Sequence, residues 1–386
     1  MEVKVSVVIP VYNAENYMDR CLQRLSLQTL EEIEIILVDD GSTDASLDRC
    51  YMHAVKDGRI KVIHQSNKGP AEARNTGLSY ATGKWVAFVD PDDYVDKDYC
   101  KAAYDYGEEC SADVVMFGAV RGNSQLVLAD ESICFKEPFE VLDIQCAILY
   151  PYMIKKSRNE LVRKRYESAK ISALALAAPW NKLYRMSFLK EHDLKFPENL
   201  LTLDDMTFNY LVFGCSPKVA YLNRELYHYC FNIKSITNKY DPDRIDKDVA
   251  VFQTIRDDIR QNASEEKEQA NKEQANKEQV NKEKLFNDNK LMQAYYARVI
   301  KSFAILCRLC FFNPKSTNGF KDKLKLALDT MDMDEYKEAF KQIDIRMLEP
   351  KLKAVVFAVR TRNPFFLYVL HLLQTMTLGR GQGTKI

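Results

Sequence analysis

The chain has 386 residues, 46% of them hydrophobic, and its 55 basic side chains balance 55 acidic ones. This composition supports a sizeable core and excludes a chain that is disordered throughout, and the balanced charge excludes a general attraction to nucleic acid. The N-terminus enters an apolar run at residues 5–9 without the basic segment and cleavage site of a secretory signal. We therefore expect a cytoplasmic protein in which most of the ten cysteines pack as small apolar residues, Cys307 and Cys310 included.

Five apolar runs alternate with helical sequence over residues 1–120. The runs cover residues 4–9, 33–38, 60–63, 85–89 and 114–120, and the helical stretches cover residues 15–27, 45–56, 71–81 and 97–109. Strands that are apolar on both faces and separated by helices are typical of a parallel sheet covered on both sides. The sequence predicts an α/β domain whose ligands bind beyond the carboxyl ends of the strands.

Distinctive residues follow four of these predicted strands. They are Pro10, Tyr12 and Asn13 after the first strand, Asp39 and Gly41 after the second, Lys68 after the third, and Asp90 and Asp92 after the fourth. Because the carboxyl ends of parallel strands meet at one edge of a sheet, we expect these residues to converge there.

The loop Asp90-Pro91-Asp92-Asp93 offers two carboxylates one residue apart, a pattern that suits a hard divalent ion such as Mg²⁺ or Mn²⁺. A protein that supplies one or two carboxylates leaves coordination positions for the oxygens of a diphosphate. An isolated loop of this kind is more often a surface turn or a helix N-cap. Its place among the other polar residues instead indicates a metal site formed by Asp92 and Asp90.

The residues after the first two strands are candidates for binding a nucleotide base. The carboxylate of Asp39 is able to accept the N3–H of uracil, and Gly41 has no side chain to keep a ligand from the backbone. Tyr12 either stacks on the base or is a buried tyrosine beside Pro10. We assign Thr43 and Asp44 to capping the next helix.

Two basic residues, Lys68 and Arg74, lie at the start of the helical stretch 71–81. Backbone N–H groups at a helix N-terminus favour anions, so both side chains are candidates for flanking a diphosphate. Ordinary surface charge is the alternative for each. Arg74 is the stronger candidate because it lies inside the helix, beside Ala71 and Ala73, and is expected to need a partner.

An acidic pair, Asp204-Asp205, precedes another helical stretch. Such a pair commonly caps a helix. Alternatively, one of the two carboxylates takes the proton from an attacking hydroxyl group.

The remainder of the chain divides by pattern. Residues 121–240 continue the first globule, and residues 241–290 form a charged spacer in which the pentapeptide Lys-Glu-Gln-Ala/Val-Asn starts at Lys267, Lys272 and Lys277. A period of five draws no apolar stripe on a helix, so we expect a solvated helix, with disorder as the alternative. Residues 291–386 are expected to be helical, and either pack on the first globule or rest on a membrane surface.

Four motifs, in order along the chain, resemble those of the family 2 glycosyltransferases, which have the GT-A fold. The resemblance covers residues 4–240 and rests on Val8-Ile9-Pro10-Val11-Tyr12-Asn13, Val38-Asp39-Asp40-Gly41-Ser42-Thr43-Asp44, Asn67-Lys68-Gly69-Pro70-Ala71-Glu72-Ala73-Arg74-Asn75-Thr76-Gly77 and Phe88-Val89-Asp90-Pro91-Asp92-Asp93. It implies that Asp39 binds uracil, Asp90 the ribose side and Asp92 the metal. It also implies that Asp205 is the catalytic base, with Asp204 where the family usually has Glu. Trp180-Asn181-Lys182-Leu183-Tyr184 resembles a segment under the acceptor site, although a core tryptophan is the alternative, and His228 with residues 234–237 resembles a loop that closes on the diphosphate.

The resemblance therefore implies an inverting transfer of a sugar from a UDP-sugar to a hydroxyl of a saccharide or lipid-linked acceptor, in bacterial surface polysaccharide synthesis. Two rivals remain. A sugar-1-phosphate nucleotidyltransferase would be expected to have a glycine-rich basic loop where this chain has Pro10-Val11-Tyr12-Asn13. A non-catalytic module that retains the nucleotide-sugar pocket is disfavoured by the complete acidic set, and turnover distinguishes it from an enzyme.

Overall fold

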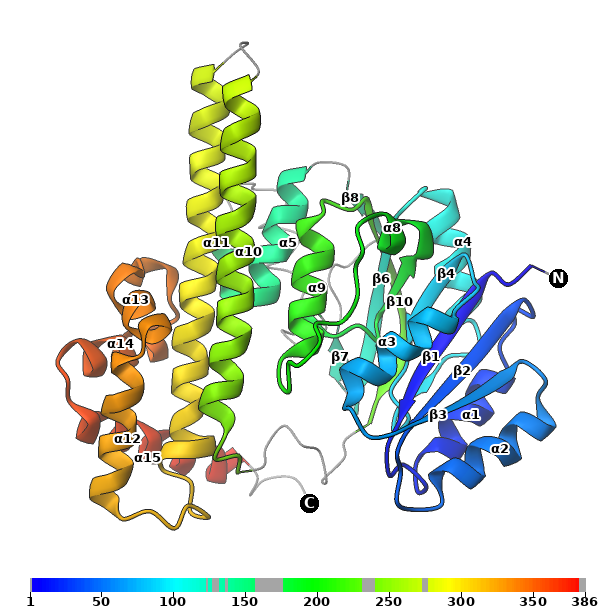
Figure 1. The fold of residues 1–386 in the computed structure, drawn as a ribbon, viewed down its shortest axis with the longest axis horizontal. Helices are drawn as coiled ribbons and strands as arrows, with labels where there is room; N and C mark the ends of the chain where they lie inside the picture. Colours follow the sequence, from blue (N-terminus) through cyan, green and yellow to red (C-terminus); the bar gives the residue numbers. More distant parts are fainter. Residues whose placement is uncertain are drawn as a thin grey trace. The chain divides into compact units, whose positions relative to one another are not determined.

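The computed structural model describes residues 2–122, 124–126, 132–135, 138–156, 176–230, 240–272 and 277–381. The chain divides into two compact units, Met1–Ile233 and Lys234–Ile386 (Figure 1). The first unit is an α/β domain, and the second is built from helices.

The first unit is built on one sheet. Its strands are β1 Val5–Val11, β2 Ile33–Asp40, β3 Ile60–Gln65, β4 Trp85–Phe88, β5 Tyr94–Val95, β6 Val114–Arg121, β7 Ser124–Leu126, β8 Ile133–Phe135, β9 Lys182–Arg185 and β10 Val219–Tyr229. The described strands follow the order β3-β2-β1-β4-β9-β6-β10-β5, with β7 beside β6 and β8 beside β10. The neighbours β3, β2, β1 and β4 pair in parallel, as do β6 and β10. The expected mostly parallel sheet is confirmed.

One strand runs against this direction in the middle of the sheet. β9 lies between β4 and β6 and is antiparallel to both. The strand expected at residues 114–120 does form, as β6. It does not pair with β4, because the four-residue strand β9, from much later in the chain, lies between them. The second half of the unit therefore completes the sheet that the first half begins.

Helices cover both faces of this sheet (Figure 1). They are α1 Met18–Ser26, α2 Ser46–Lys56, α3 Pro70–Tyr80, α4 Tyr99–Glu109, α5 Pro138–Leu149, α8 Met186–Glu191 and α9 Asp204–Gly214, with a 3₁₀ turn at Pro151–Lys156. Residues of α1, α2 and α4 share one core with the strands, including Leu22, Cys50 and Ala103. Every residue of β1 and β2 is buried, as expected for strands that are covered on both sides.

Helix α3 packs on the opposite face, very close to the strands. A Cβ atom added at Gly77 would lie 2.3 Å from Cγ1 of Val8 and 3.3 Å from Cγ2 of Val38. Only glycine allows this approach. Arg74 lies one turn before Gly77, so the same approach brings its side chain toward the ends of β1 and β4.

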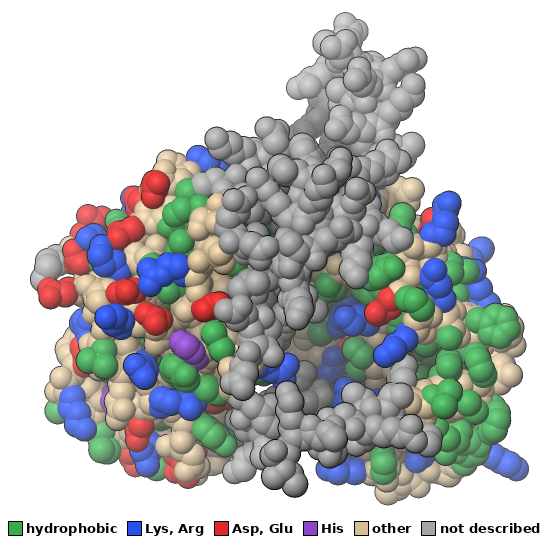
Figure 2. Space-filling model, turned by 180° about the vertical axis from the view of Figure 1, so that it is seen from behind, with side chains coloured by type: hydrophobic (Ala, Val, Ile, Leu, Met, Phe, Trp, Pro, Cys, Tyr) green, Lys and Arg blue, Asp and Glu red, His purple; other side chains and the backbone are tan. Residues whose placement is uncertain are grey.

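The second unit consists of α10 Arg244–Lys272, α11 Lys277–Leu306, a π-helical turn Cys307–Phe311, α12 Phe320–Asp332, α13 Asp334–Gln342, a 3₁₀ turn Ile345–Met347, α14 Pro350–Arg360 and α15 Pro364–Gly381. The described residues of the pentapeptide repeat belong to the end of α10 and the start of α11. Cys307 and Cys310 are free and buried, in agreement with a packing role. Among the described residues, no helix combines the length and the apolar character needed to cross a membrane. In Figure 2, acidic and basic side chains of the described residues are mixed over the left of the view, whereas hydrophobic and basic side chains predominate on the right.

Candidate functional site

The acidic loop Asp90–Asp93 follows β4 and leads into β5. The side chain of Asp90 is 26% exposed, whereas Asp93 is buried, with 1% exposed. Burial, together with the nearby charges of Asp90 and Asp92, raises the pKa of Asp93 to about 8, although hydrogen bonds from Cys230 and Tyr227 oppose the rise. The loop backbone is held from outside, since Arg20 Nη2 donates to the carbonyl oxygen of Asp92 at 2.7 Å and Cys21 Sγ lies 3.8 Å from that of Asp90.

Arg74 joins this loop to the second acidic pair. Its Nη2 donates to Asp90 Oδ1 at 3.1 Å, and its Nη1 donates to Asp205 Oδ1 at 2.9 Å and to Asp204 Oδ2 at 3.2 Å. The residue is 5% exposed. The partner expected for Arg74 is therefore a set of three carboxylates, which its one positive charge only partly neutralises.

Asp205 is in the first turn of α9 and remains reachable, with 34% of its side chain exposed. The surrounding protein desolvates the carboxyl group and raises its pKa to about 7. Arg74 and Lys182 oppose this rise, while the charges of Asp204 and Asp90 add to it. A carboxyl group with a pKa near neutrality is suited to accept a proton and pass it on.

A structural link between α3 and α9 was missed by the sequence analysis. Asn75 exchanges two hydrogen bonds with the backbone of Phe196, both at 2.8 Å. The Phe196 ring stacks on Phe208 of α9 at 4.0 Å, and the Arg74 guanidinium lies 5.3 Å from the Phe196 ring centre. This link fixes the helix that carries Asp205 against the helix that carries Arg74.

Asp39 is fully buried at the end of β2. Its Oδ2 lies 2.8 Å from His64 Nδ1 and accepts the N–H of Ser42 at 3.3 Å, while Oδ1 has no hydrogen-bond partner among the described residues. A buried carboxylate with spare acceptor capacity fits a ligand that donates an N–H. His64, from the end of β3, was not singled out in the sequence because only the pairing of β2 with β3 brings it to Asp39.

The other residues near β1 and β2 have local partners. Pro10 pairs with Val38 inside the sheet, and Tyr12 is 50% exposed, so the buried alternative for Tyr12 is wrong. Asn13 Oδ1 accepts the N–H of Thr43 at 2.8 Å, which ties the two loops together. Gly41 has a φ of 69°, and a Cβ there would meet the Asn67 nitrogen at 2.8 Å, so backbone packing by itself requires this glycine.

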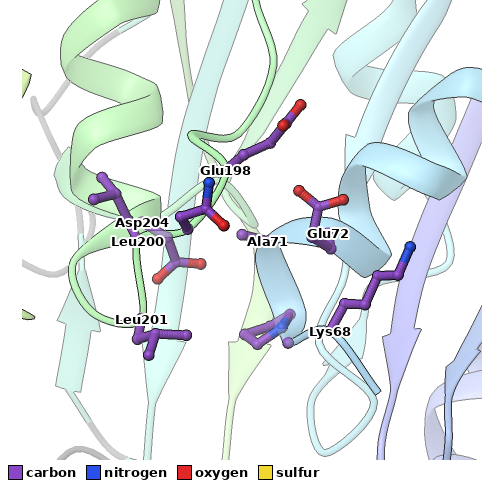
Figure 3. Close-up of a pocket in the computed structure, with 10 residues that line it drawn as sticks. Lys68, Ala71, Glu72, Glu198, Leu200, Leu201 and Asp204 are labelled. Carbon is purple, nitrogen blue, oxygen red and sulfur yellow. The ribbon is translucent and has the colours of Figure 1, made fainter. Parts of the chain in front are cut away.

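An acidic side chain of the protein itself binds the backbone just before α3. Asp40 accepts the N–H groups of Lys68 at 2.9 Å and Gly69 at 2.8 Å. These two donors are therefore already bonded, which the sequence analysis did not foresee. The side chain of Lys68 is exposed and extends away from Asp204 (Figure 3).

A pocket of about 450 Å³ lies between α3 and the segment that leads into α9 (Figure 3). Leu201 is 70% exposed there, and Asn199 and Leu203 have left-handed φ angles of 66° and 56°. The pocket is lined by Lys68, Gly69, Pro70, Ala71, Glu72, Glu198, Asn199, Leu200, Leu201 and Asp204. It borders Asp204, and hence the candidate base.

The acidic loop fits a divalent ion that is shared with a ligand. Within the described ranges, no group of three or more His, Cys, Asp or Glu side chains could hold a metal. Asp90 and Asp92 supply an incomplete set of oxygen ligands, and their charge is high enough to raise the pKa of Asp93. Such a set suits an ion whose remaining positions are filled by diphosphate oxygens and water.

The predicted acceptor-side residues occupy different environments. Trp180 is 2% exposed and stacks on Tyr227, which agrees with the core alternative. Lys182 is fully buried, and its ammonium group donates to the carbonyl oxygens of Leu176 and Ala178 and to Asn181 Oδ1. His228 stacks on Tyr94 at 4.4 Å, whereas residues 234–237 lie outside the described residues.

Comparison with known proteins gives one family. The family model described as "Glycosyl transferase family 2" matches residues 6–192. The chain is 32% identical to putative glycosyltransferase EpsH of Bacillus subtilis over 260 residues, which are 67% of this chain and 70% of EpsH. It is 36% identical to glycosyltransferase GlyA of Streptococcus pneumoniae over 58% of this chain, but this covers only 30% of GlyA. It is also 29% identical to poly(ribitol-phosphate) β-N-acetylglucosaminyltransferase TarS of Staphylococcus aureus, over 58% of this chain and 35% of TarS.

Solved structures agree on the fold. The crystal structure of S. aureus TarS residues 1–349 in complex with UDP-GlcNAc has a TM-score of 0.62 to this chain at 19% sequence identity, and covers 97% of this chain and 92% of that one. At this level of identity the likeness concerns the fold. The family match and the similarity to EpsH decide against a nucleotidyltransferase. The chain belongs to glycosyltransferase family 2, has the GT-A fold and is a glycosyltransferase.

Proposed function

We propose that the protein transfers a sugar from a UDP-sugar, with inversion, to a hydroxyl group of a saccharide or lipid-linked acceptor in bacterial surface polysaccharide synthesis. The observation that carries this proposal is the contact of one guanidinium, that of Arg74, with both Asp90 and Asp205. It brings the nucleotide side of the sheet and the candidate base to the same place. A transferase needs both groups within reach of one reacting carbon.

The donor binds along the carboxyl ends of β1, β2 and β4. Asp39 accepts the N3–H of uracil through its remaining acceptor capacity, and the exposed Tyr12 ring stacks on the base. Asp90 contacts the ribose side, and Asp92, with Asp90, holds Mn²⁺ or Mg²⁺ against the diphosphate. The ion, when bound, offsets the charge that develops on the departing diphosphate.

Asp205 acts as the base. Its carboxylate accepts the proton of the acceptor hydroxyl as the hydroxyl oxygen attacks the anomeric carbon, and the bond from that carbon to the diphosphate oxygen breaks in the same displacement. Arg74 fixes the carboxylate at 2.9 Å while part of the Asp205 side chain stays exposed for the hydroxyl group. The pKa near 7 leaves Asp205 sufficiently basic for this step at neutral pH.

The pocket beside Asp204 is the proposed place for a sugar ring next to the reacting centre. Its volume of about 450 Å³ lies within the range of small-molecule sites. Asp204 and Glu72 offer carboxylate oxygens that accept hydrogen bonds from hydroxyl groups, and Leu201 offers an apolar surface. The names of the relatives support UDP-GlcNAc as the first donor to test, since TarS is an N-acetylglucosaminyltransferase.

Turnover tests this proposal directly. The protein is incubated with Mn²⁺, a saccharide acceptor and each of a panel of UDP-sugars, and release of UDP is measured. One UDP-sugar should support release that stops with chelator and in Asp205→Asn. Binding is measured separately by thermal unfolding with each UDP-sugar. Because a bound ligand raises the midpoint of unfolding, the proposal is wrong if no UDP-sugar raises it.

Contact between the C-terminal helices and the inner face of the cell membrane stays a separate prediction. Helix α14 exposes Lys353, Phe357 and Arg360 at spacings of four and three residues, which places an apolar side chain between two basic residues. Co-sedimentation with vesicles that contain anionic lipid measures such contact. Phe357→Ser should weaken it, and equal sedimentation of both proteins would contradict the prediction.

A further inference from the structure

One tyrosine contacts both ends of the acidic loop. The hydroxyl group of Tyr227, in β10, accepts the N–H of Asp90 at 3.2 Å and donates to Asp93 Oδ2 at 2.7 Å. A third bond closes the loop, since the N–H of Asp93 donates to the carbonyl oxygen of Asp90 at 3.1 Å. The Tyr227 hydroxyl group thus fixes the backbone direction of the segment that presents Asp90 and Asp92.

Asp93 differs from the other carboxylates of the loop in where its oxygens point. Its Oδ1 accepts the N–H of Cys230 at 2.7 Å, and its Oδ2 accepts the hydroxyl of Tyr227. With 1% of the residue exposed, both oxygens are directed into the protein, whereas 26% of the Asp90 side chain is exposed. Asp93 therefore anchors the loop to β10 and is not placed to contact a ligand.

Tyr227 is in turn held by Trp180. The two rings stack at a centroid distance of 4.6 Å and an interplanar angle of 15°, and both residues are buried. Trp180 precedes β9, the strand between β4 and β6, and its carbonyl oxygen accepts the hydroxyl of Tyr99 at 3.4 Å. The stacked pair Trp180 and Tyr227, called here the aromatic support, connects the acidic loop to the centre of the sheet.

We propose that Tyr227, held by Trp180 and acting through Asp93, is a positioning residue that sets the direction of Asp90 and Asp92 toward the donor's metal-bound diphosphate. This inference rests on the proposed function, because it assigns a role within that site. It concerns the shape of the loop and not its charge. The aromatic support is required for the gain in nucleotide affinity that the metal provides. It is not required for the nucleotide affinity that remains without metal.

The test compares two Tyr→Phe variants, each of which lacks one buried hydroxyl group. Tyr227→Phe removes the hydroxyl group and keeps the ring on Trp180. Tyr99→Phe, the matched control, removes a buried hydroxyl group that donates to the carbonyl oxygen of Trp180 and, among the described residues, makes no hydrogen bond to the acidic loop. Affinity for UDP is measured by calorimetry with Mn²⁺ and with chelator, and kcat and KM for the donor are measured beside it.

Tyr227→Phe should lower the affinity for UDP with Mn²⁺ on the order of tenfold, about the effect of one hydrogen bond, and leave the affinity with chelator unchanged. Tyr99→Phe should match the wild type in both conditions. Asp93→Asn should resemble Tyr227→Phe, and the double variant should be no weaker than either single variant, because both remove the same bond.

Three outcomes separate the explanations. Equal loss in both tyrosine variants, or loss with chelator as well as with Mn²⁺, would show a general packing effect and overturn the inference. Wild-type affinity in Tyr227→Phe would overturn it while leaving the proposed function intact. A wild-type protein that binds UDP equally with Mn²⁺ and with chelator would instead contradict the metal assignment in the proposed function.

Discussion

The two acidic groups of the site are held in different ways. The loop Asp90–Asp93 is held by the sheet and by α1, because its backbone or Asp93 bonds to Tyr227 and Cys230 at the end of β10 and to Arg20 and Cys21 of α1. The pair Asp204-Asp205 opens α9 after a left-handed Leu203, and both of its carboxylates accept hydrogen bonds from Arg74. The first group is held through its backbone, whereas the carboxylates of the second group, on a helix that Asn75, Phe196 and Phe208 link to α3, are held by Arg74 of α3.

This difference matches the tasks proposed for the two groups. A metal-binding loop has to keep its oxygens in place before the donor arrives, and a rigid backbone does this. A base has to exchange a proton with a substrate. The side chain of Asp205, which is paired with Arg74, is 34% exposed, so a substrate hydroxyl group has room to reach it. Changes to the two groups should therefore affect different measurements.

The sharpest separation is expected from Asp205→Asn. It removes the proton acceptor while keeping the shape of the side chain, so kcat should fall by about 10² to 10⁴. Affinity for UDP, which depends on the acidic loop, should stay within about twofold of the wild type. Asp204→Asn is the matched control and should lose much less activity. Unchanged transfer by Asp205→Asn would refute its role as the base.

The converse separation is expected from Asp92→Ala. Without this carboxylate, affinity for UDP in the presence of Mn²⁺ should fall to the value that the wild type shows with chelator. Asp105→Ala removes an exposed carboxylate that pairs with Lys101 and should behave as the wild type. A variant whose UDP binding still responds fully to Mn²⁺ would show that the metal is held elsewhere.

The pH dependence of catalysis should follow the base and not the loop. The pKa of Asp205 is raised to about 7, so its active, ionised form is lost as the pH falls through that value. Below this pH, kcat/KM should fall by about tenfold per unit, and above it the rate should level off. Initial rates over a pH series measure this, with UDP affinity as the control. A rate that stays constant down to pH 5 would contradict the assignment.

The smallest effect is expected from a change at Gly77, where the close packing of α3 on the sheet brings Arg74 to both acidic groups. Gly77→Ala places a Cβ 2.3 Å from Val8 and should lower the free energy of unfolding by about 1–3 kcal/mol. Gly58→Ala, which meets nothing within 4 Å, should leave it nearly unchanged. Chemical denaturation measures both. Equal stability of the two variants would mean that α3 has room to move away from the sheet.

The sequence was sufficient for elements that depend on local pattern. The strands expected at 33–38 and 114–120 appear as β2 and β6, and the helix expected at 45–56 appears as α2, because apolar periodicity acts over a few positions. The four motifs likewise identified the family.

Contacts between distant segments were not predictable in the same way. Nothing near Phe196 in the sequence indicates that it would hold Asn75 and stack on Phe208. Asp40 was passed over although it binds two backbone N–H groups before α3, and Tyr227 lies in a strand that the pattern did not reveal. These residues matter through partners that only the folded sheet supplies.

The late strand β9 has a consequence for how the chain is made. In the described sheet, β4 and β6 are joined through β9, whose residues Lys182–Arg185 leave the ribosome after both neighbours. Until then the facing edges of β4 and β6 have no partner, and exposed strand edges invite pairing with other chains. A fragment of residues 1–120 is therefore expected to aggregate on its own. During synthesis, β4 and β6 are therefore expected to gain their shared neighbour only after residues 182–185 have emerged.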